Sequence, residues 1–242
     1  MDFAHTYNDL FSFISAKRLE VDLNKKNLLS DMLRIYKIVN SQNIDSKQDN
    51  LYYFDAMSNE KSALCIGQAI ETLKCQNIEY NKLNLQISYL LDELICNIQQ
   101  NSMAGLGLLS VYYDANENKS IDICIADDGI GIFGSYVNCS KYLDLLENGD
   151  ADAICLAREG YSTKNLPETE NRGYGISSNA KWIVDGLDGE FSIISGKALY
   201  IENRSGIHIF SLPENIEWPG TMISVRIPVY VPETFNIYNY IS

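Results

Sequence analysis

The chain lacks several features that would place it in a specialised class of proteins. Its 242 residues contain no apolar run near 18 residues, and the N-terminus has no basic region followed by an apolar block. We therefore expect neither a membrane span nor a signal peptide. None of the six cysteines forms a CxxC pair, which argues against a zinc site or a disulfide framework and favours a reducing cytoplasm.

Basic residues are also scarce in this chain. There are 19 Lys and Arg against 32 Asp and Glu, and no Lys/Arg run or alternation of basic with aromatic residues. The net charge of −13 repels nucleic-acid phosphates at long range, so we expect no nucleic-acid partner. A nucleotide is not excluded, because nucleotide binding relies on local backbone N–H groups and a metal ion.

The first 80 residues are expected to form a mainly helical region. Hydrophobic periodicity predicts helices over residues 24–39 and over Lys61–Cys75, and the polar residues 41–50 between them predict a loop. The sequence leaves two roles open for this region, a homodimer interface and a surface for a partner protein.

From Asn84 onward the pattern predicts helices combined with an antiparallel-rich sheet, which is an α+β fold with helices on one face. Residues 133–172 show little periodicity, so we expect them to be irregular except for a helix near Asp150–Arg158. Their length and glycines indicate a mobile lid. Helices are predicted over Asn84–Ser102 and Gly173–Val184, and strands over Leu108–Asp114, Ser120–Asp127, Glu190–Ile194, Ala198–Glu202, Ile207–Ser211 and Thr221–Val229.

Polar residues lie beside the apolar stripe of the helix Asn84–Ser102. Glu93 and Asn97 are four residues apart and so share a face, which Gln100 and Asn101 extend by another turn. A carboxylate and an amide one turn apart can orient a water and give an oxygen ligand to Mg²⁺. A solvated helix face is the alternative interpretation.

Two glycine motifs follow further along the chain. Asp127-x-Gly129-x-Gly131 comes directly after a predicted strand, where a carboxylate can accept a hydrogen bond from an exocyclic amine and glycines permit close approach or a sharp turn. The second motif, Arg172–Gly175, opens a predicted helix whose free N–H groups would form an anion site. A tight turn without a ligand and an ordinary glycine-rich helix start explain these motifs equally well.

In this order the motifs resemble those of the Bergerat-fold ATPases, the superfamily of DNA gyrase, heat-shock chaperones, sensor histidine kinases and mismatch-repair proteins. The resemblance covers about residues 84–230. Glu93 and Asn97 are similar to its N box, Asp127–Gly131 to its first glycine box, Gly173–Ile176 to its second, and Gly220-Thr221 to its closing motif.

The resemblance implies a two-layer α/β sandwich over residues 81–232, with 233–242 as a C-terminal tail, and Mg-ATP as the ligand. Asn97 would bind Mg²⁺, Glu93 would be the base that activates a water or a hydroxyl, and Asp127 would take the adenine amino group. The other implied nucleotide contacts are Gly129 and Gly131 at the adenine, Thr221 beside Asp127, and Ser162, Thr163, Lys164, Gly173, Tyr174 and Gly175 at the phosphates.

The chain departs from histidine kinases in one important respect. Neither His5 nor His208 lies in a plausible phosphoacceptor helix, which argues against autophosphorylation on histidine. The compact size and the segment Gly160–Lys164 resemble the anti-sigma-factor serine kinases more closely. We therefore expect a cytoplasmic Mg-ATP-binding protein that acts as a slow ATPase or a Ser/Thr protein kinase on a regulatory partner. The alternatives are a nucleotide-dependent switch that recruits a partner without turnover, and an interaction protein whose motifs are degenerate.

Overall fold

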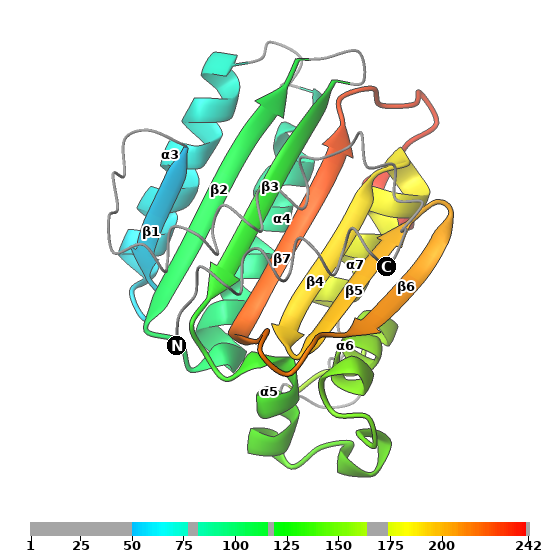
Figure 1. The fold of residues 1–242 in the computed structure, drawn as a ribbon. Helices are drawn as coiled ribbons and strands as arrows, with labels where there is room; N and C mark the ends of the chain where they lie inside the picture. The colour runs from blue at the N-terminus through cyan, green and yellow to red at the C-terminus, as the bar shows by residue number, and fades with distance from the viewer. Residues whose placement is uncertain (1–49, 77–81, 116–118, 164–173, 241–242) are drawn as a thin grey trace.

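A seven-stranded antiparallel sheet organises the described part of the chain. The structure is a computed structural model that describes residues 50–76, 82–115, 119–163 and 174–240 (Figure 1). All neighbouring strands are antiparallel in the order β1-β2-β3-β7-β4-β5-β6, which confirms the predicted α+β class. The strands are β1 (Leu51–Asp55), β2 (Leu106–Asp114), β3 (Ser120–Asp127), β4 (Glu190–Gly196), β5 (Ala198–Asn203), β6 (Gly206–Ser211) and β7 (Trp218–Pro228).

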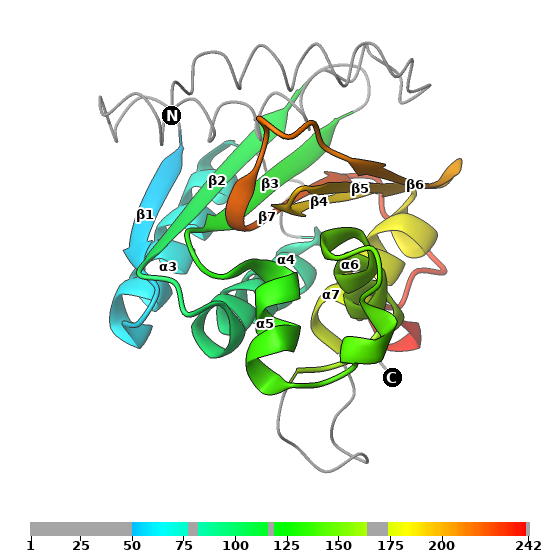
Figure 2. The same ribbon diagram turned by 60° about the horizontal axis from the view of Figure 1, so that its bottom comes forward.

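The described helices all lie on one face of the sheet (Figure 2). None of the helices within the described ranges is long and apolar enough to cross a membrane. The α-helices are α3 (Asn59–Gln76), α4 (Asn84–Asn97), α5 (Gly131–Cys139), α6 (Asp150–Glu159) and α7 (Tyr174–Lys181); π-helical turns follow α4 at Ile98–Ser102 and α7 at Trp182–Gly186, and 3-10 turns cover Leu143–Leu145 and Ile237–Asn239.

The core lies between the helices and the sheet, because apolar side chains recur at helical spacing in the helices and at every second residue in the strands. On β3 the side chains of Ile121, Ile123 and Ile125 project toward the helices and are at most 2% exposed. The predicted helices over Lys61–Cys75 and Asn84–Ser102 are confirmed, the second with its last turn in π-helical form. The predicted helix over residues 24–39 lies outside the described residues.

The expected helix near Asp150–Arg158 is confirmed as α6, but the rest of the described part of residues 133–172 is more regular than expected. Residues 131–163 contain α5, the 3-10 turn Leu143–Leu145 and α6, and Tyr136, Ala153 and Ile154 are almost fully buried. Helix α5, which the sequence reading missed, is only nine residues long. It repeats its apolar face too few times for a period to be recognised in the sequence.

Residues 51–76 belong to the same sheet and core as the rest of the described chain. Strand β1, which the sequence reading missed, pairs with β2, and Phe54 and Leu73 join the core that contains α4 and β3. At the other end, Phe235 and Tyr240 of the C-terminal tail pack against that core, and the Phe235 ring lies beside Gly186. Among the described residues, no break between two cores occurs near residue 80.

Candidate functional site

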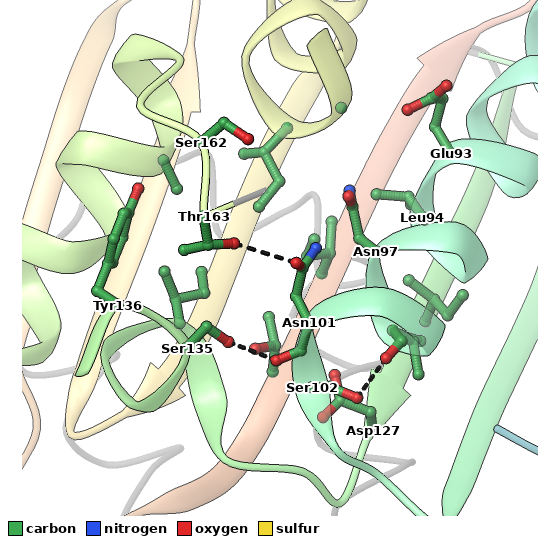
Figure 3. Close-up of a pocket in the computed structure, with 18 of the residues that line it drawn as sticks. Glu93, Leu94, Asn97, Asn101, Ser102, Asp127, Ser135, Tyr136, Ser162 and Thr163 are labelled. Atoms are coloured by element: carbon green, nitrogen blue, oxygen red, sulfur yellow. Dashed lines mark hydrogen bonds between the residues drawn. The ribbon is translucent and has the colours of Figure 1, made fainter. Parts of the chain in front are cut away.

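A cavity of about 270 Å³ lies between the helices and the sheet (Figure 3). This volume is close to the lower end of the roughly 300–1,000 Å³ that is usual for small-molecule sites. Seven residues that the sequence analysis selected line it together: Glu93, Asn97, Asp127, Ser162, Thr163, Gly175 and Thr221. They come from the four motifs and from the segment Gly160–Lys164, and the fold brings them into one site.

Helix α4 supplies Glu93 and Asn97 to one wall. Both side chains are half-buried and point into the cavity from the same face of the helix (Figure 3). Leu90, Leu91 and Ile95 are at most 3% exposed, so they hold α4 against the core and fix the direction of this face. Glu93 and Asn97 therefore face the cavity together as two half-buried side chains.

The π-helical turn after α4 brings a further amide into the cavity. Asn101 lines the site, and its Oδ1 accepts a hydrogen bond of 3.1 Å from the hydroxyl of Thr163 (Figure 3). The Ser135 hydroxyl on α5 lies 2.7 Å from the Asn101 carbonyl oxygen. A π turn within an α-helix is frequent at functional sites. Here it places Asn101 between α4, α5 and the segment that follows α6.

Asp127 forms a buried polar end of the cavity at the end of β3. The residue is 2% exposed, and its Oδ1 accepts a hydrogen bond of 2.8 Å from the Gly129 N–H. Burial raises the pKa of this carboxyl to about 7, while the N–H groups of Gly129 and Thr221 act in the opposite direction. Trp218 donates from Nε1 to the Asp127 carbonyl oxygen at 2.9 Å and holds the strand end in place. Asp127 is therefore a buried acceptor facing the cavity.

The glycines of the first motif have a packing role. A Cβ on Gly129 would lie 2.2 Å from the Ser102 carbonyl oxygen, which also accepts a 2.8 Å hydrogen bond from the Ile130 N–H. Gly131 has φ +69°, a conformation that side chains rarely adopt. Neither glycine is among the residues that line the cavity. They let the loop after β3 turn and pack against the π-helical turn, as the tight-turn alternative predicted.

The second glycine motif meets α4 through Gly175. A Cβ on Gly175 would lie 2.6 Å from Asn97 Nδ2, so the first turn of α7 approaches Asn97 as closely as a glycine permits. Tyr174 is the first residue of α7. The predicted phosphate contacts Lys164 and Gly173 lie outside the described residues.

Helix α5 contributes residues that the sequence analysis missed. Tyr136 is 1% exposed and lines the cavity, and its hydroxyl donates to the Tyr161 carbonyl oxygen at 2.7 Å. The Tyr142 ring packs edge-on against the rings of both tyrosines. This aromatic cluster fixes the chain just before Ser162 and Thr163. No motif marks Ser135 or Tyr136, and only recognition of α5 as a helix would have suggested them.

The described lining of the cavity contains two carboxylates and no Lys, Arg or His. Glu93 and Asp127 lie at opposite ends (Figure 3). Within the described ranges, no three His, Cys, Asp or Glu side chains gather as a metal site. Mg²⁺ often binds through one or two protein ligands plus substrate phosphates and waters. The amide oxygen of Asn97 beside Glu93 suits a cation of that kind better than a resident metal.

All six cysteines are free thiols. A scan against models of protein families and a search of curated proteins find no match to this chain.

Proposed function

We propose that the chain binds Mg-ATP in this cavity, in a two-layer sandwich of the Bergerat type. The observation that carries the proposal is the meeting of four separate motifs at one site. Asn97 and Glu93 from α4, Asp127 from β3, Gly175 from α7 and Thr221 from β7 all line the same cavity. Chance motif matches would not be expected to converge in this way.

The two ends of the cavity suit the two ends of a nucleotide. Adenine belongs beside Asp127 and Thr221, where the buried carboxylate accepts from the exocyclic amine and Ile125 and Ile223 offer an apolar wall. The phosphates belong beside Asn97 and the N-terminus of α7, because the N–H groups and the dipole of a helix N-terminus favour an anion. Asn101 and Thr163 lie between the two ends (Figure 3).

The proposed activity is slow ATP hydrolysis or phosphoryl transfer to a Ser/Thr of a regulatory protein partner. Glu93 is the carboxylate at the phosphate end, one helical turn from Asn97. It takes the proton of an attacking water or hydroxyl as that oxygen bonds to the terminal phosphorus and ADP leaves. Mg²⁺ held by Asn97 would neutralise charge on the phosphates. Asp127 is too far along the cavity to share this role.

The test is calorimetric titration of the full chain with ATP, ADP and adenosine, with Mg²⁺ and with EDTA, followed by measurement of phosphate release. We expect saturable binding of ATP that weakens in EDTA, and slow release of phosphate. Absence of any adenine-nucleotide binding would refute the proposal. Binding without phosphate release or transfer would favour the non-catalytic switch.

A further inference from the structure

A largely buried arginine joins the last turn of α6 to the sheet. Arg158 donates from Nε to Oε2 of Glu202 and from Nη2 to Oε1, each at 2.6 Å. The two side chains are 13% and 7% exposed, and the Tyr200 hydroxyl donates to the same carboxylate at 2.7 Å. Such a bidentate pair fixes orientation as well as distance, because the guanidinium fork is planar and matches a carboxylate.

The same arginine also reaches α7. Its Nη1 lies 3.4 Å from the Ser177 carbonyl oxygen, in the first turn of that helix. Ala157, its neighbour in the chain, lines the cavity, and Ser162 and Thr163 follow within a few residues. Arg158 therefore belongs to one wall at the proposed phosphate end of the cavity, the end of α6, and contacts the other wall, the start of α7.

Helix α6 is held at its other end as well. Oδ2 of Asp150 accepts a hydrogen bond of 2.9 Å from the Lys197 N–H in the turn between β4 and β5. Gly196 in that turn has φ +57°, and a Cβ there would lie 2.2 Å from the Asp150 carboxylate. With Asp150 at one end and Arg158 at the other, α6 has a fixed position over β4 and β5.

We propose that Arg158 is a positioning residue for the nucleotide site: through Glu202 and Ser177 it sets the separation between α7 and the Ser162–Thr163 segment. The inference rests on the proposed function, because it assigns α7 to the phosphates. Displacement of one wall by about 1 Å can weaken a well-oriented interaction severely. The adenine end, built from β3 and β7, does not depend on this pair.

The chain contains a matched control in a second buried ion pair. Arg226 donates from Nε and Nη2 to the two oxygens of Asp122, each at 2.8 Å, and their side chains are 9% and 0% exposed. This pair joins β7 to β3 within the sheet, and neither residue lines the cavity. A purely structural role for Arg158 predicts that loss of either pair has the same consequences.

The experiment compares Arg158→Lys with Arg226→Lys in the full chain. Each variant keeps the charge and loses the bidentate geometry, so we expect both to unfold at lower denaturant. Only Arg158→Lys should weaken binding of Mg-ATP, by about tenfold, or about 1.4 kcal/mol. Its affinity for adenosine, which has no phosphates, should stay within about twofold of wild type by the same scale.

The outcomes separate the two proposals. Wild-type protein that binds no nucleotide refutes the proposed function. Wild-type binding with unchanged ATP affinity in Arg158→Lys, or with equal losses for ATP and adenosine, overturns the positioning role. Equal loss of ATP affinity in Arg226→Lys overturns it too. If Arg158→Lys does not fold, the double variant Arg158→Gln with Glu202→Gln, which leaves no unpaired charge, must show the same selective loss for ATP.

Discussion

Gly175 on α7 lies directly against the side chain of Asn97 on α4. A Cβ on Gly175 would stand 2.6 Å from Asn97 Nδ2 and 3.2 Å from its Oδ1, both shorter than ordinary contacts. Two motifs that are far apart in the sequence are therefore in contact, and the glycine permits it. The amide of Asn97 therefore lies against the first turn of α7.

This contact predicts that Gly175→Ala weakens Mg-ATP binding, because the methyl group must displace either Asn97 or α7. We expect a loss of roughly tenfold in affinity by calorimetry. Gly67 on α3 is the control, since it is exposed and a Cβ there meets nothing within 4 Å. Gly67→Ala should bind ATP normally and raise the free energy of unfolding by roughly 0.5–1 kcal/mol. Normal ATP affinity in Gly175→Ala would show that α7 does not contribute to the phosphate site.

Replacing Asp127, the carboxylate at the proposed adenine end, should remove affinity without unfolding the protein. Asp127→Asn can still accept the Gly129 N–H but presents a donor to the adenine amine. Loss of a hydrogen bond to a charged acceptor costs roughly 1.5–3 kcal/mol, or about tenfold to a hundredfold in affinity. Asp128→Asn in the same loop is the control, because Asp128 is exposed and its Oδ1 accepts the Gly105 and Leu106 N–H groups. Equal affinities for the two variants would place adenine elsewhere.

The raised pKa of Asp127 predicts a pH dependence of binding. The carboxyl is largely neutral below its pKa of about 7, and a neighbouring amine donor favours the ionised form. Affinity for adenosine, which carries no titrating phosphate, should therefore increase about tenfold from pH 6 to pH 8. Asp127→Asn should show no such increase, and a flat wild-type profile would contradict the assignment.

The same shift affects stability with the opposite sign. In the unfolded chain this carboxyl titrates near 3.8, so between about pH 4 and 7 the folded protein binds the additional proton. The contribution of Asp127 to the free energy of unfolding should consequently fall as pH rises through this window. Denaturant unfolding of wild type and of Asp127→Asn at pH 5 and pH 7.5 gives their free energies of unfolding. The stability of the variant relative to wild type should be greater at pH 7.5 than at pH 5.

Local patterns were sufficient to predict the elements that carry the motifs. The bounds of β3, Ser120–Asp127, agree with the prediction because its isoleucines alternate with polar or small residues and a turn follows immediately. The apolar residues of α4 recur over several helical turns, so the polar face beside them could also be assigned from the sequence. Three of the selected residues that line the cavity, Glu93, Asn97 and Asp127, lie on these two elements.

The rest depends on contacts that no local pattern shows. Strand β1 is five residues long, and the sequence around it reads as helical. Helix α5 begins directly at Gly131, so the residues that were interpreted as a turn also open a helix. The pair of Arg158 with Glu202 joins α6 to β5 across the fold and is set by tertiary packing alone. Sequence reasoning could select residues that line the cavity but not the contacts that hold the elements around it.

Glu93→Gln tests the proposed base. The amide keeps the size and polarity of the side chain but cannot take a proton, so we expect ATP affinity to be retained and turnover to slow by roughly 10²–10⁴. Asp92→Asn is the control, because Asp92 is the neighbouring residue, is exposed and does not line the cavity. Phosphate release from both variants and wild type is measured in single-turnover conditions. A rate for Glu93→Gln equal to that of wild type would remove Glu93 from the mechanism.

Amide hydrogen exchange tests the part of the predicted lid that the structure describes. Helices α5 and α6 are anchored by buried Tyr136 and Ile154, so their central amides should be protected even without nucleotide. Ser162 and Thr163 lie beyond α6 and line the cavity, and Mg-ATP should slow exchange there while leaving α6 nearly unchanged. Strand β3 provides an internal reference that stays protected throughout. A different result would support the longer mobile lid predicted from the sequence. Both helices would then exchange rapidly in the free protein, and the whole stretch would become protected on addition of Mg-ATP.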